Sequence, residues 1–242
     1  GRPAVSAVFL ARGGWGLAVL GLAGRAFVAR DRGLTVPGHK ADGEALAEGD
    51  DVMSIAGPAH ALLSAERGGL NYLGHLSGIA SKTAKLVALT AHTEAKICDT
   101  RKPTPWLRAV EKYAVRAGGG ANHRFGLYDA VLIKDNHIAV AGGITAALNA
   151  AQKNAGDLPI EIEVDTLAQF EEALAADAKI VLLDNMTPDM LRAAVALNQG
   201  RAILEASGRV SEDSVVGIAE SGVDYISVGG ITHSAPTLDL GL

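Results

Sequence analysis

The chain has 242 residues, of which 48% are hydrophobic and 4% aromatic, and its formal net charge is −5. This composition can fill a sizeable core, which excludes an intrinsically disordered chain, and the charge has the wrong sign for a nucleic-acid-binding protein. The longest stretch without a charge, residues 136–152, is too short and too polar to cross a membrane. The single cysteine, Cys98, excludes an intramolecular disulfide and a CxxC zinc site and favours a reducing cytoplasm.

The first 57 residues contain short apolar runs and a turn-rich segment, residues 41–50, which together indicate a small β-rich module. Pro58 then opens a helical stretch that extends to about Ala91. Gly68 and Gly69 weaken the middle of this helix by about 1 kcal/mol each relative to alanine. The glycine pair therefore predicts either a break in the helix or a close contact.

From about Leu89 onward, short β-rich runs alternate with helix-like segments, a pattern typical of βα units around a parallel sheet. Each run stops at polar residues or glycine. Because the carboxyl ends of the strands converge in a (β/α) barrel, this pattern favours a barrel with one polar mouth. An open doubly wound sheet is the competing architecture, in which fewer strands would reach the ligand. The runs are residues 95–99, 130–134, 160–165, 179–184, 202–206 and 224–228.

A helix is predicted between the first two runs, with Thr104 as its N-cap, Pro105 at its first position and a stop at residues 118–120. Its buried face would consist of three apolar side chains, Leu107, Val110 and Tyr113. Three basic side chains recur every fourth residue on another face and are interpreted as solvated: Arg108, Lys112 and Arg116. Cys98, inside a predicted strand, is interpreted as core packing.

Positive charge is concentrated in residues 96–134, whose net charge is +5, while the other 203 residues sum to −10. Such a local excess predicts a small polyanionic substrate rather than ordinary salt bridges. Arginine pairs with planar carboxylates through two hydrogen bonds, and lysine offers a point charge to phosphate oxygens. Five of these side chains lie at strand ends or just before a strand and are expected at one mouth: Arg101, Lys102, His123, Arg124 and Lys134.

Acidic side chains are expected on the opposite wall of the mouth. Glu161, Glu163 and Asp165 alternate along one predicted strand and so share a face, and Asp184 ends the next strand. Carboxylates beside phosphate-seeking cations indicate either recognition of hydroxyl groups or Mg²⁺, which borrows phosphate oxygens from a substrate. One of the three alternating acids is expected only to neutralise nearby cations.

Glycine follows the last two predicted strands, within residues 205–208 and 228–234. Phosphate groups in such barrels often bind backbone amides at this place, where side chains must be small. Glycine after one strand is a weak signal, but its coincidence at the last two strands predicts a phosphate site.

Seven motifs in this chain occur in the order typical of one known family. From about Ala61 to its C-terminus the chain resembles quinolinate phosphoribosyltransferase, also called nicotinate-nucleotide pyrophosphorylase (carboxylating). No single motif would suffice, but the ordered set is specific. The motifs are Asp99-Thr100-Arg101-Lys102, Glu111-Lys112-Tyr113-Ala114-Val115-Arg116, Gly118-Gly119-Gly120-Ala121-Asn122-His123-Arg124, Leu132-Ile133-Lys134-Asp135-Asn136-His137, Glu163-Val164-Asp165, Leu183-Asp184-Asn185 and Val228-Gly229.

The resemblance implies a reaction of quinolinate with phosphoribosyl pyrophosphate that gives nicotinate mononucleotide, pyrophosphate and CO₂ in cytoplasmic NAD synthesis, with Mg²⁺ as cofactor. It implies an α/β fold in which residues 92–234 form an open or incomplete (β/α) barrel. Residues 1–91 would form a smaller N-terminal α/β sandwich domain that residues 235–242 complete. A homodimer, alone or within a higher oligomer, would place Arg67 in the neighbouring subunit's site, with no nucleic-acid or membrane partner.

The resemblance also assigns roles to residues. Lys134, Glu163 and Asp184 would be catalytic, and Glu163 and Asp184 would meet the ribose hydroxyls and Mg²⁺. Lys102 and Lys134 would meet pyrophosphate and carboxylate oxygens. The carboxylates of quinolinate would bind Arg101, His123 and Arg124, and the 5-phosphate would bind Ser207, Gly208 and Gly229. The whole substrate-binding set is Arg67, Thr100, Arg101, Lys102, His123, Arg124, Lys134, Glu163, Asp184, Ser207, Gly208, Gly229 and His233.

The chain departs from the family pattern at four places. Pro103 stands where threonine is usual, Trp106 and Arg209 stand where glycine is usual, and the pair Gly68-Gly69 is an addition. Two alternative functions stay open on the sequence alone. One is an anion-binding or molybdenum-transport-associated paralogue without this activity, and the other is an aldolase with Lys134 as its Schiff-base lysine.

Overall fold

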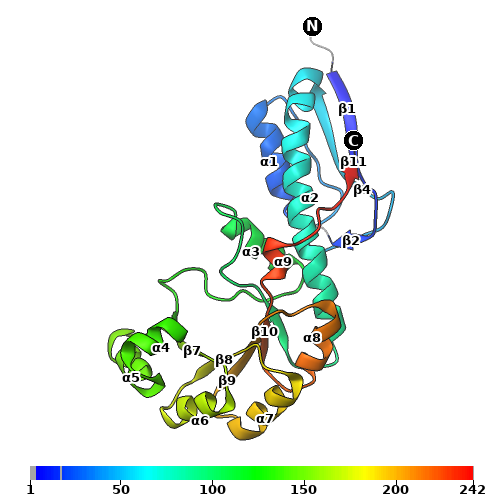
Figure 1. Cartoon of the computed structure of the whole chain (residues 1–242). Coiled ribbons are helices and arrows are strands. Elements are labelled where there is room, and N and C mark those ends of the chain that lie inside the picture. The colour runs from blue at the N-terminus through cyan, green and yellow to red at the C-terminus, as the bar shows by residue number, and fades with distance from the viewer. Residues whose placement is uncertain (1–3, 17, 242) are drawn as a thin grey trace. The chain divides into compact units, whose positions relative to one another are not determined.

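The computed structural model describes residues 4–16 and 18–241, which group into two compact units (Figure 1). The first unit comprises described residues of 1–85, 103–120 and 231–242, and the second comprises 86–102 and 121–230. Residues 103–120 thus group with the first unit, although they lie within the stretch that the sequence assigns to the barrel. The predicted domain limits, 1–91 with 235–242 and 92–234, stay a prediction.

The first unit contains a three-stranded antiparallel sheet in the order β11-β1-β4. Its strands are β1 (Ala4–Ala11), β4 (Asp51–Pro58) and β11 (Leu240–Gly241), so the C-terminal end of the chain pairs with the first strand. A second sheet joins β2 (Trp15–Gly16) to β3 (Ala45–Leu46). The interpretation of residues 1–57 as β-rich is wrong for α1 (Leu20–Arg30), whose Ala23 and Phe27 recur on one buried face.

Helix α2 (Ala59–Thr90) confirms the long helical stretch predicted after Pro58. The helix is continuous through the glycine pair, so no break occurs there. A Cβ atom at Gly69 would lie 2.3 Å from Cε2 of Phe27, which explains the glycine as a close contact with α1. Phe27 also packs on Phe9 of β1, with 5.7 Å between the ring centroids. The glycine therefore lets α1 and α2 share one apolar core with the antiparallel sheet.

Helix α3 (Arg108–Ala117) begins three residues later than predicted. Trp106 has φ 69°, in the left-handed region, so the chain turns at residues 104–107 and cannot start a helix at Pro105. The predicted buried face is wrong, and the predicted solvated face holds only for Arg116, which is exposed. Tyr113 is exposed, whereas Lys112 is 2% exposed, and the buried residues of the helix are Glu111, Lys112, Ala114 and Val115. The predicted stop is confirmed, with Gly118 as C-cap.

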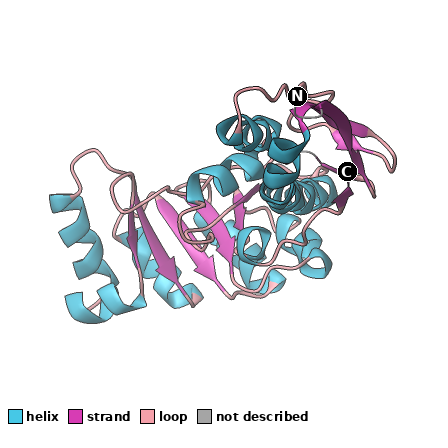
Figure 2. Ribbon diagram, turned by 90° about the horizontal axis from the view of Figure 1, so that it is seen from above, coloured by secondary structure: helices cyan, strands magenta, loops and turns pink. Residues whose placement is uncertain are grey.

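The second unit contains a parallel six-stranded sheet, so the α/β class is confirmed (Figure 2). The strand order is β5-β10-β9-β8-β7-β6, which has no reversal and hence no switch point of the doubly wound type. All six predicted runs are strands. They are β5 (Lys96–Cys98), β6 (Val131–Ile133), β7 (Ile160–Val164), β8 (Ile180–Asp184), β9 (Ile203–Ser207) and β10 (Tyr225–Ser227).

Helices follow the strands as βα units predict. Threonine caps two of them: the hydroxyl of Thr166 accepts a hydrogen bond from the Gln169 N–H, and that of Thr187 accepts one from the Met190 N–H. The helices are α4 (Asp135–Ala141), α5 (Ile144–Asn154), α6 (Leu167–Ala175), α7 (Pro188–Asn198), α8 (Glu212–Ala219) and α9 (Gly230–His233). Cys98 is buried, as expected. Within the part of the chain that the structure describes, no helix is long and apolar enough to cross a membrane.

Candidate active site

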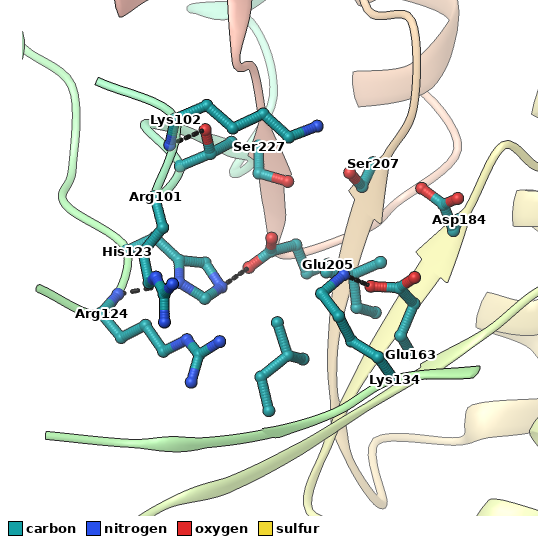
Figure 3. A pocket seen from close by; sticks show the side chains of 13 residues that line it. Arg101, Lys102, His123, Arg124, Lys134, Glu163, Asp184, Glu205, Ser207 and Ser227 are labelled. Carbon is teal, nitrogen blue, oxygen red and sulfur yellow. Dashed lines mark hydrogen bonds and ion pairs between the residues drawn. The ribbon is translucent and has the colours of Figure 1, made fainter. Parts of the chain in front are cut away.

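A pocket of about 360 Å³ opens at the carboxyl ends of the parallel strands in the second unit (Figure 3). Every strand of the six-stranded sheet, or the loop next to it, contributes a side chain, as expected where parallel strands end together. The lining residues are Thr100, Arg101, Lys102, His123, Arg124, Leu132, Lys134, Glu163, Leu182, Asp184, Glu205, Ser207 and Ser227. All five cations predicted at the mouth are therefore brought together.

Two arginines form a positively charged wall of this pocket. Arg124 donates from Nη1 to the carbonyl of Ala130 at 3.1 Å, whereas the buried Nε atoms of Arg101 and Arg124 have no hydrogen-bond partner among the described residues. Burial and then the charge of Arg101 lower the pKa of Arg124. The two guanidinium groups thus destabilise each other, and an anion bound between them would relieve this repulsion.

The loop that carries His123 and Arg124 is anchored by Asp99 at the end of β5. The buried Asp99 carboxylate accepts hydrogen bonds from Asn122 Nδ2 at 2.6 Å and from the backbone N–H of His123 at 3.0 Å. Asp99 lies in a motif quoted above but is absent from the predicted site. Its contact joins residues 23 and 24 positions apart, which the sequence pattern alone does not reveal.

His123 lies between two buried carboxylates. Its Nε2 is 3.0 Å from Glu161 Oε2 and 3.4 Å from Glu205 Oε2. The ligand atoms of this trio lie within 4.8 Å of one another, which is close enough to hold a metal ion. However, a histidine proton already bridges the carboxylates, so we interpret the trio as a hydrogen-bonded ion-pair cluster. Of the three alternating acids, Glu161 thus pairs with His123 and Glu163 with Lys134, while Asp165 is exposed.

The pKa values of His123 and Glu161 are both raised within the cluster. Burial lowers the pKa of His123, but its hydrogen bonds to Glu161 and Glu205 raise that pKa to about 10. Burial likewise raises the pKa of Glu161, and the charge of Glu205 adds to this rise. The backbone N–H of Arg124 donates to Nδ1 of His123 at 2.8 Å, so Nε2 is the ring nitrogen that donates to the carboxylates.

The acidic wall consists of Glu163 on β7 and Asp184 at the end of β8. Glu163 is paired with the ammonium of Lys134, and Asp184 accepts a hydrogen bond from Asn185 Nδ2 at 2.6 Å. Both carboxylates face the same pocket and offer only oxygen atoms. Such a pair could hold Mg²⁺, which binds through one or two carboxylates and keeps the rest of its shell for water and phosphate.

The chain folds tightly at the ends of β8 and β9. Gly208 has φ 97°, and a Cβ atom there would lie 2.3 Å from Asn185 Oδ1, so this position requires glycine. The backbone N–H of Asn185 donates to the carbonyl of Ser207 at 2.9 Å. Arg209 has φ 48°, which explains why the family usually has glycine there, and its side chain is exposed. The arginine neither fills the pocket nor displaces Ser207 from its lining.

Nine of the predicted site residues line the pocket: Thr100, Arg101, Lys102, His123, Arg124, Lys134, Glu163, Asp184 and Ser207. Gly208 directly follows the lining residue Ser207, and Gly229 lies two residues after the lining residue Ser227, but neither glycine lines the pocket. Arg67 and His233 are exposed and belong to the first unit. Sequence reasoning missed Glu205 and Ser227, which lie inside predicted strands. Glu205 could have been found by its two-residue spacing from Ser207, because alternate residues share a strand face.

Comparison with known proteins identifies the family. A model of the quinolinate phosphoribosyl transferase N-terminal domain matches residues 1–77, and a model of the C-terminal domain of the same enzyme matches residues 79–242. The chain belongs to the quinolinate phosphoribosyltransferase family. The resemblance inferred from the seven motifs is therefore confirmed.

Named relatives of this quinolinate phosphoribosyltransferase-family chain agree with the match. It is 48% identical over 205 residues to a probable nicotinate-nucleotide pyrophosphorylase [carboxylating] of Bacillus subtilis, which covers 84% of the chain and 71% of the relative. It is 46% identical over 204 residues to the nicotinate-nucleotide pyrophosphorylase [carboxylating] of Mycobacterium leprae, and this match covers 83% of the chain and 72% of the relative. The nicotinate-nucleotide pyrophosphorylase structure from Francisella tularensis has a TM-score of 0.96 at 38% identity, covering 100% of this chain and 86% of that one.

Proposed function

We propose that the protein transfers the phosphoribosyl group of phosphoribosyl pyrophosphate to quinolinate and releases CO₂, giving nicotinate mononucleotide and pyrophosphate for NAD synthesis. The observation that carries the proposal is the convergence of five cations on one pocket beside two carboxylates, in a chain of this family. A dicarboxylate and a polyphosphate both need such a cluster of cations.

In this proposal quinolinate binds against the arginine wall. Its two vicinal carboxylates would pair with Arg101 and Arg124, whose buried Nε atoms have unused donors. Thr100 and His123 complete that end of the pocket. Binding of the dianion would offset the repulsion between the guanidinium groups, so the empty pocket already favours a substrate with two negative charges.

Phosphoribosyl pyrophosphate would bind along the other strand ends. Lys102 and Lys134 would contact pyrophosphate oxygens, and Glu163 and Asp184 would contact the ribose hydroxyls. The 5-phosphate would bind near Ser207, Gly208 and Gly229. Glu163 and Asp184 would also hold Mg²⁺, which, when bound, offsets the negative charge of pyrophosphate.

The chain's residues would stabilise the charge that develops as pyrophosphate leaves C1 of the ribose. That departure gives the ribose oxocarbenium character, and the fixed carboxylates of Glu163 and Asp184 stabilise this positive charge more in the transition state than in the ground state. The pyridine nitrogen then forms the bond to C1. Once this nitrogen is quaternary, it stabilises the electron pair that stays on the neighbouring ring carbon as CO₂ departs, and a proton from water then bonds to that carbon. No protein nucleophile is needed for either step.

We further propose the assembly and finer architecture that the family implies. The parallel sheet would belong to an open (β/α) barrel, and the first unit would be an α/β sandwich. Two copies would form a homodimer in which Arg67 of one subunit reaches the quinolinate end of the other subunit's pocket. The exposed position of Arg67 on α2 is compatible with this role. The cytoplasmic location rests on the single cysteine alone.

Incubation with quinolinate, phosphoribosyl pyrophosphate and Mg²⁺ tests the activity. We expect nicotinate mononucleotide to appear, and a folded protein that makes none would overturn the proposal. Calorimetry distinguishes the proposed enzyme from the molybdenum-transport-associated paralogue, which would bind an oxyanion such as molybdate but not quinolinate. Borohydride trapping separates the aldolase, which would give an adduct on Lys134 with a carbonyl substrate. The ion pair with Glu163 already engages the side-chain nitrogen of Lys134 and argues against that chemistry.

A further inference from the structure

Two buried acids, Glu161 and Glu205, have no part in the reaction proposed above. Their exposed fractions are only 6% and 5%, and they lie on one face of the sheet, on β7 and β9. Glu163 of β7 and Glu205 of β9 both pair in register with Leu182 of β8. Glu161 pairs with Ile180, two residues farther from the carboxyl ends of the strands. Only Glu205 reaches the pocket wall. The pair therefore forms an acidic layer at and beneath the pocket.

Neither acid is fully satisfied. The Oε2 atom of each contacts Nε2 of His123, while the Oε1 atom of each is buried without a hydrogen-bond partner among the described residues. Burying carboxylates that are only half paired costs stability. Two apolar side chains of similar size would pack at lower cost, so the acids are not explained by the stability of the sheet.

The acids act on the ring of His123 and, through it, on Arg124. Nε2 is fixed by the two carboxylates, and Nδ1 faces the backbone N–H of Arg124 at 2.8 Å. The backbone N–H of His123 is itself tied to Asp99. A ring held at both nitrogens cannot rotate, so it fixes the start of the Arg124 side chain. The far end of that side chain is held by Nη1 on the carbonyl of Ala130.

We propose that Glu161 and Glu205 are positioning residues that act through His123 to hold the Arg124 guanidinium in place for a substrate carboxylate. This inference rests on the proposed function, because it takes the carboxylate to be one of the two on quinolinate. The acids do not touch the substrate in this role. They restrict the conformations of the Arg124 side chain before the substrate binds, so binding costs less conformational entropy.

The positioning role and a purely electrostatic role predict opposite results. Negative charge beside the binding site of a dianion repels it, so removal of a charge alone would strengthen binding. Loss of positioning would weaken binding instead. Glutamine keeps an oxygen that accepts from Nε2, whereas methionine has similar length and no such acceptor. The pair of substitutions at one position therefore separates the hydrogen bond from the charge.

The test is calorimetric titration of the full chain with quinolinate, for Glu205→Met, Glu205→Gln, Arg124→Ala and the double variant Glu205→Met with Arg124→Ala. Glu205→Met should weaken quinolinate binding about tenfold, and Glu205→Gln by less than about threefold. The double variant should bind no more weakly than Arg124→Ala alone, because the acid acts through the arginine. Affinity for phosphoribosyl pyrophosphate with Mg²⁺ should stay within about twofold in the two Glu205 variants, since neither removes a contact to it. The same cycle at Glu161 provides a second set of variants if Glu205→Met does not fold.

Glu220→Met is the matched control, because Glu220 pairs with His92 at 3.0 Å on the exposed surface of the same unit. It should leave quinolinate binding unchanged. Tighter quinolinate binding in both Glu205→Gln and Glu205→Met would overturn the inference. So would a double variant whose loss of affinity equals the product of the losses in Glu205→Met and Arg124→Ala. If the unsubstituted protein binds no quinolinate, the proposed function fails. If it binds quinolinate but the acid and arginine act independently, only the positioning role fails.

Discussion

Among the residues that the structure describes, two buried sites pair glutamate with histidine, and they differ in how completely the acid is satisfied. In the first unit, Glu111 accepts hydrogen bonds from His75 Nε2 at 2.7 Å and from the backbone N–H of Thr104 at 2.9 Å. In the second unit, Glu161 and Glu205 share His123 and each leaves an oxygen without a partner. A fully satisfied buried acid stabilises a fold, whereas half-satisfied acids beside a pocket indicate that the arrangement serves a ligand.

The pKa directions follow the same division. Burial alone would raise the pKa of Glu111, but its hydrogen bonds from His75 and Thr104 lower it below the ordinary value of 4.5. Burial raises the pKa of Glu161, and its bond to His123 does not offset this. The first cluster therefore favours the charged acid and contributes to stability. The second cluster instead favours the protonated form of Glu161, beneath the pocket. Substitution of Glu111 in the first unit should accordingly change stability, whereas substitutions at the pocket in the second unit should change turnover or quinolinate affinity.

The largest effect is expected for Glu163→Gln, on turnover. Loss of the carboxylate removes the charge that stabilises the oxocarbenium-like transition state, so kcat should fall about a hundredfold. The free energy of unfolding should change little, because the carboxylate is at the pocket surface. Steady-state kinetics measure the first quantity and urea unfolding the second. Glu171→Gln, an exposed acid on α6, is the control, and an unchanged kcat in Glu163→Gln would contradict the assignment.

Arg101→Ala and Arg124→Ala test the arginine wall. Each should weaken quinolinate binding by more than tenfold, because a charged hydrogen-bonded partner is worth about 1.5 to 3 kcal/mol. Neither should lower stability strongly, since the two guanidinium groups repel each other in the empty pocket. Calorimetry gives the affinities. Unchanged affinity in both variants would refute the carboxylate clamp.

Glu111→Gln should show the opposite pattern, with lower stability and unchanged quinolinate affinity. We expect a loss of about 2 kcal/mol at pH 7, because the buried charge-assisted hydrogen bonds are weakened. The pKa of Glu111 is lowered in the folded state, so its contribution is present above about pH 4.5 and is lost as the pH falls through the folded-state pKa. Urea unfolding of the two proteins at pH 7 and below about pH 4.5 should give a difference in the free energy of unfolding that shrinks at the lower pH. A constant difference would contradict the ionic role of Glu111.

The smallest effect is expected for Arg209→Gly. An arginine at φ 48° is strained by about 1 kcal/mol relative to glycine, although glycine gains more freedom in the unfolded chain. We expect a small net rise in the melting temperature. Gln199→Gly, at φ 49° on the exposed C-cap of α7, should behave alike. A fall in Arg209→Gly but not in Gln199→Gly would show that the guanidinium makes a stabilising contact.

The strands and the mouth could be predicted from the sequence because they depend on local pattern. Each buried run ends at a polar residue, and parallel strands bring those ends together, so Arg101, Lys134 and Asp184 were found without a structure. Contacts between separate segments were not predictable in the same way. Lys112 belongs to a regular basic stripe, yet it is buried because Glu111 beside it pairs with His75 on α2. Trp106 turns the chain at a left-handed position that no propensity indicates.

The acids around His123 show the same limit within the site. The alternation of Glu161, Glu163 and Asp165 predicts a shared strand face but not which acid is buried. That choice depends on the loop after β5, where Asp99 fixes the backbone of His123 and so brings its ring over the sheet. Glu205 is enclosed by the apolar sequence of β9 and gives no signal except its spacing from Ser207.

The central claim is that one pocket performs both the transfer and the loss of CO₂. The most direct measurement is the yield of labelled CO₂ from quinolinate labelled in the carboxylate next to the ring nitrogen, compared with the yield of nicotinate mononucleotide. We predict equal yields that require phosphoribosyl pyrophosphate and fall together in Glu163→Gln. Absence of both products from the folded protein, or CO₂ release without nucleotide formation, would contradict the claim.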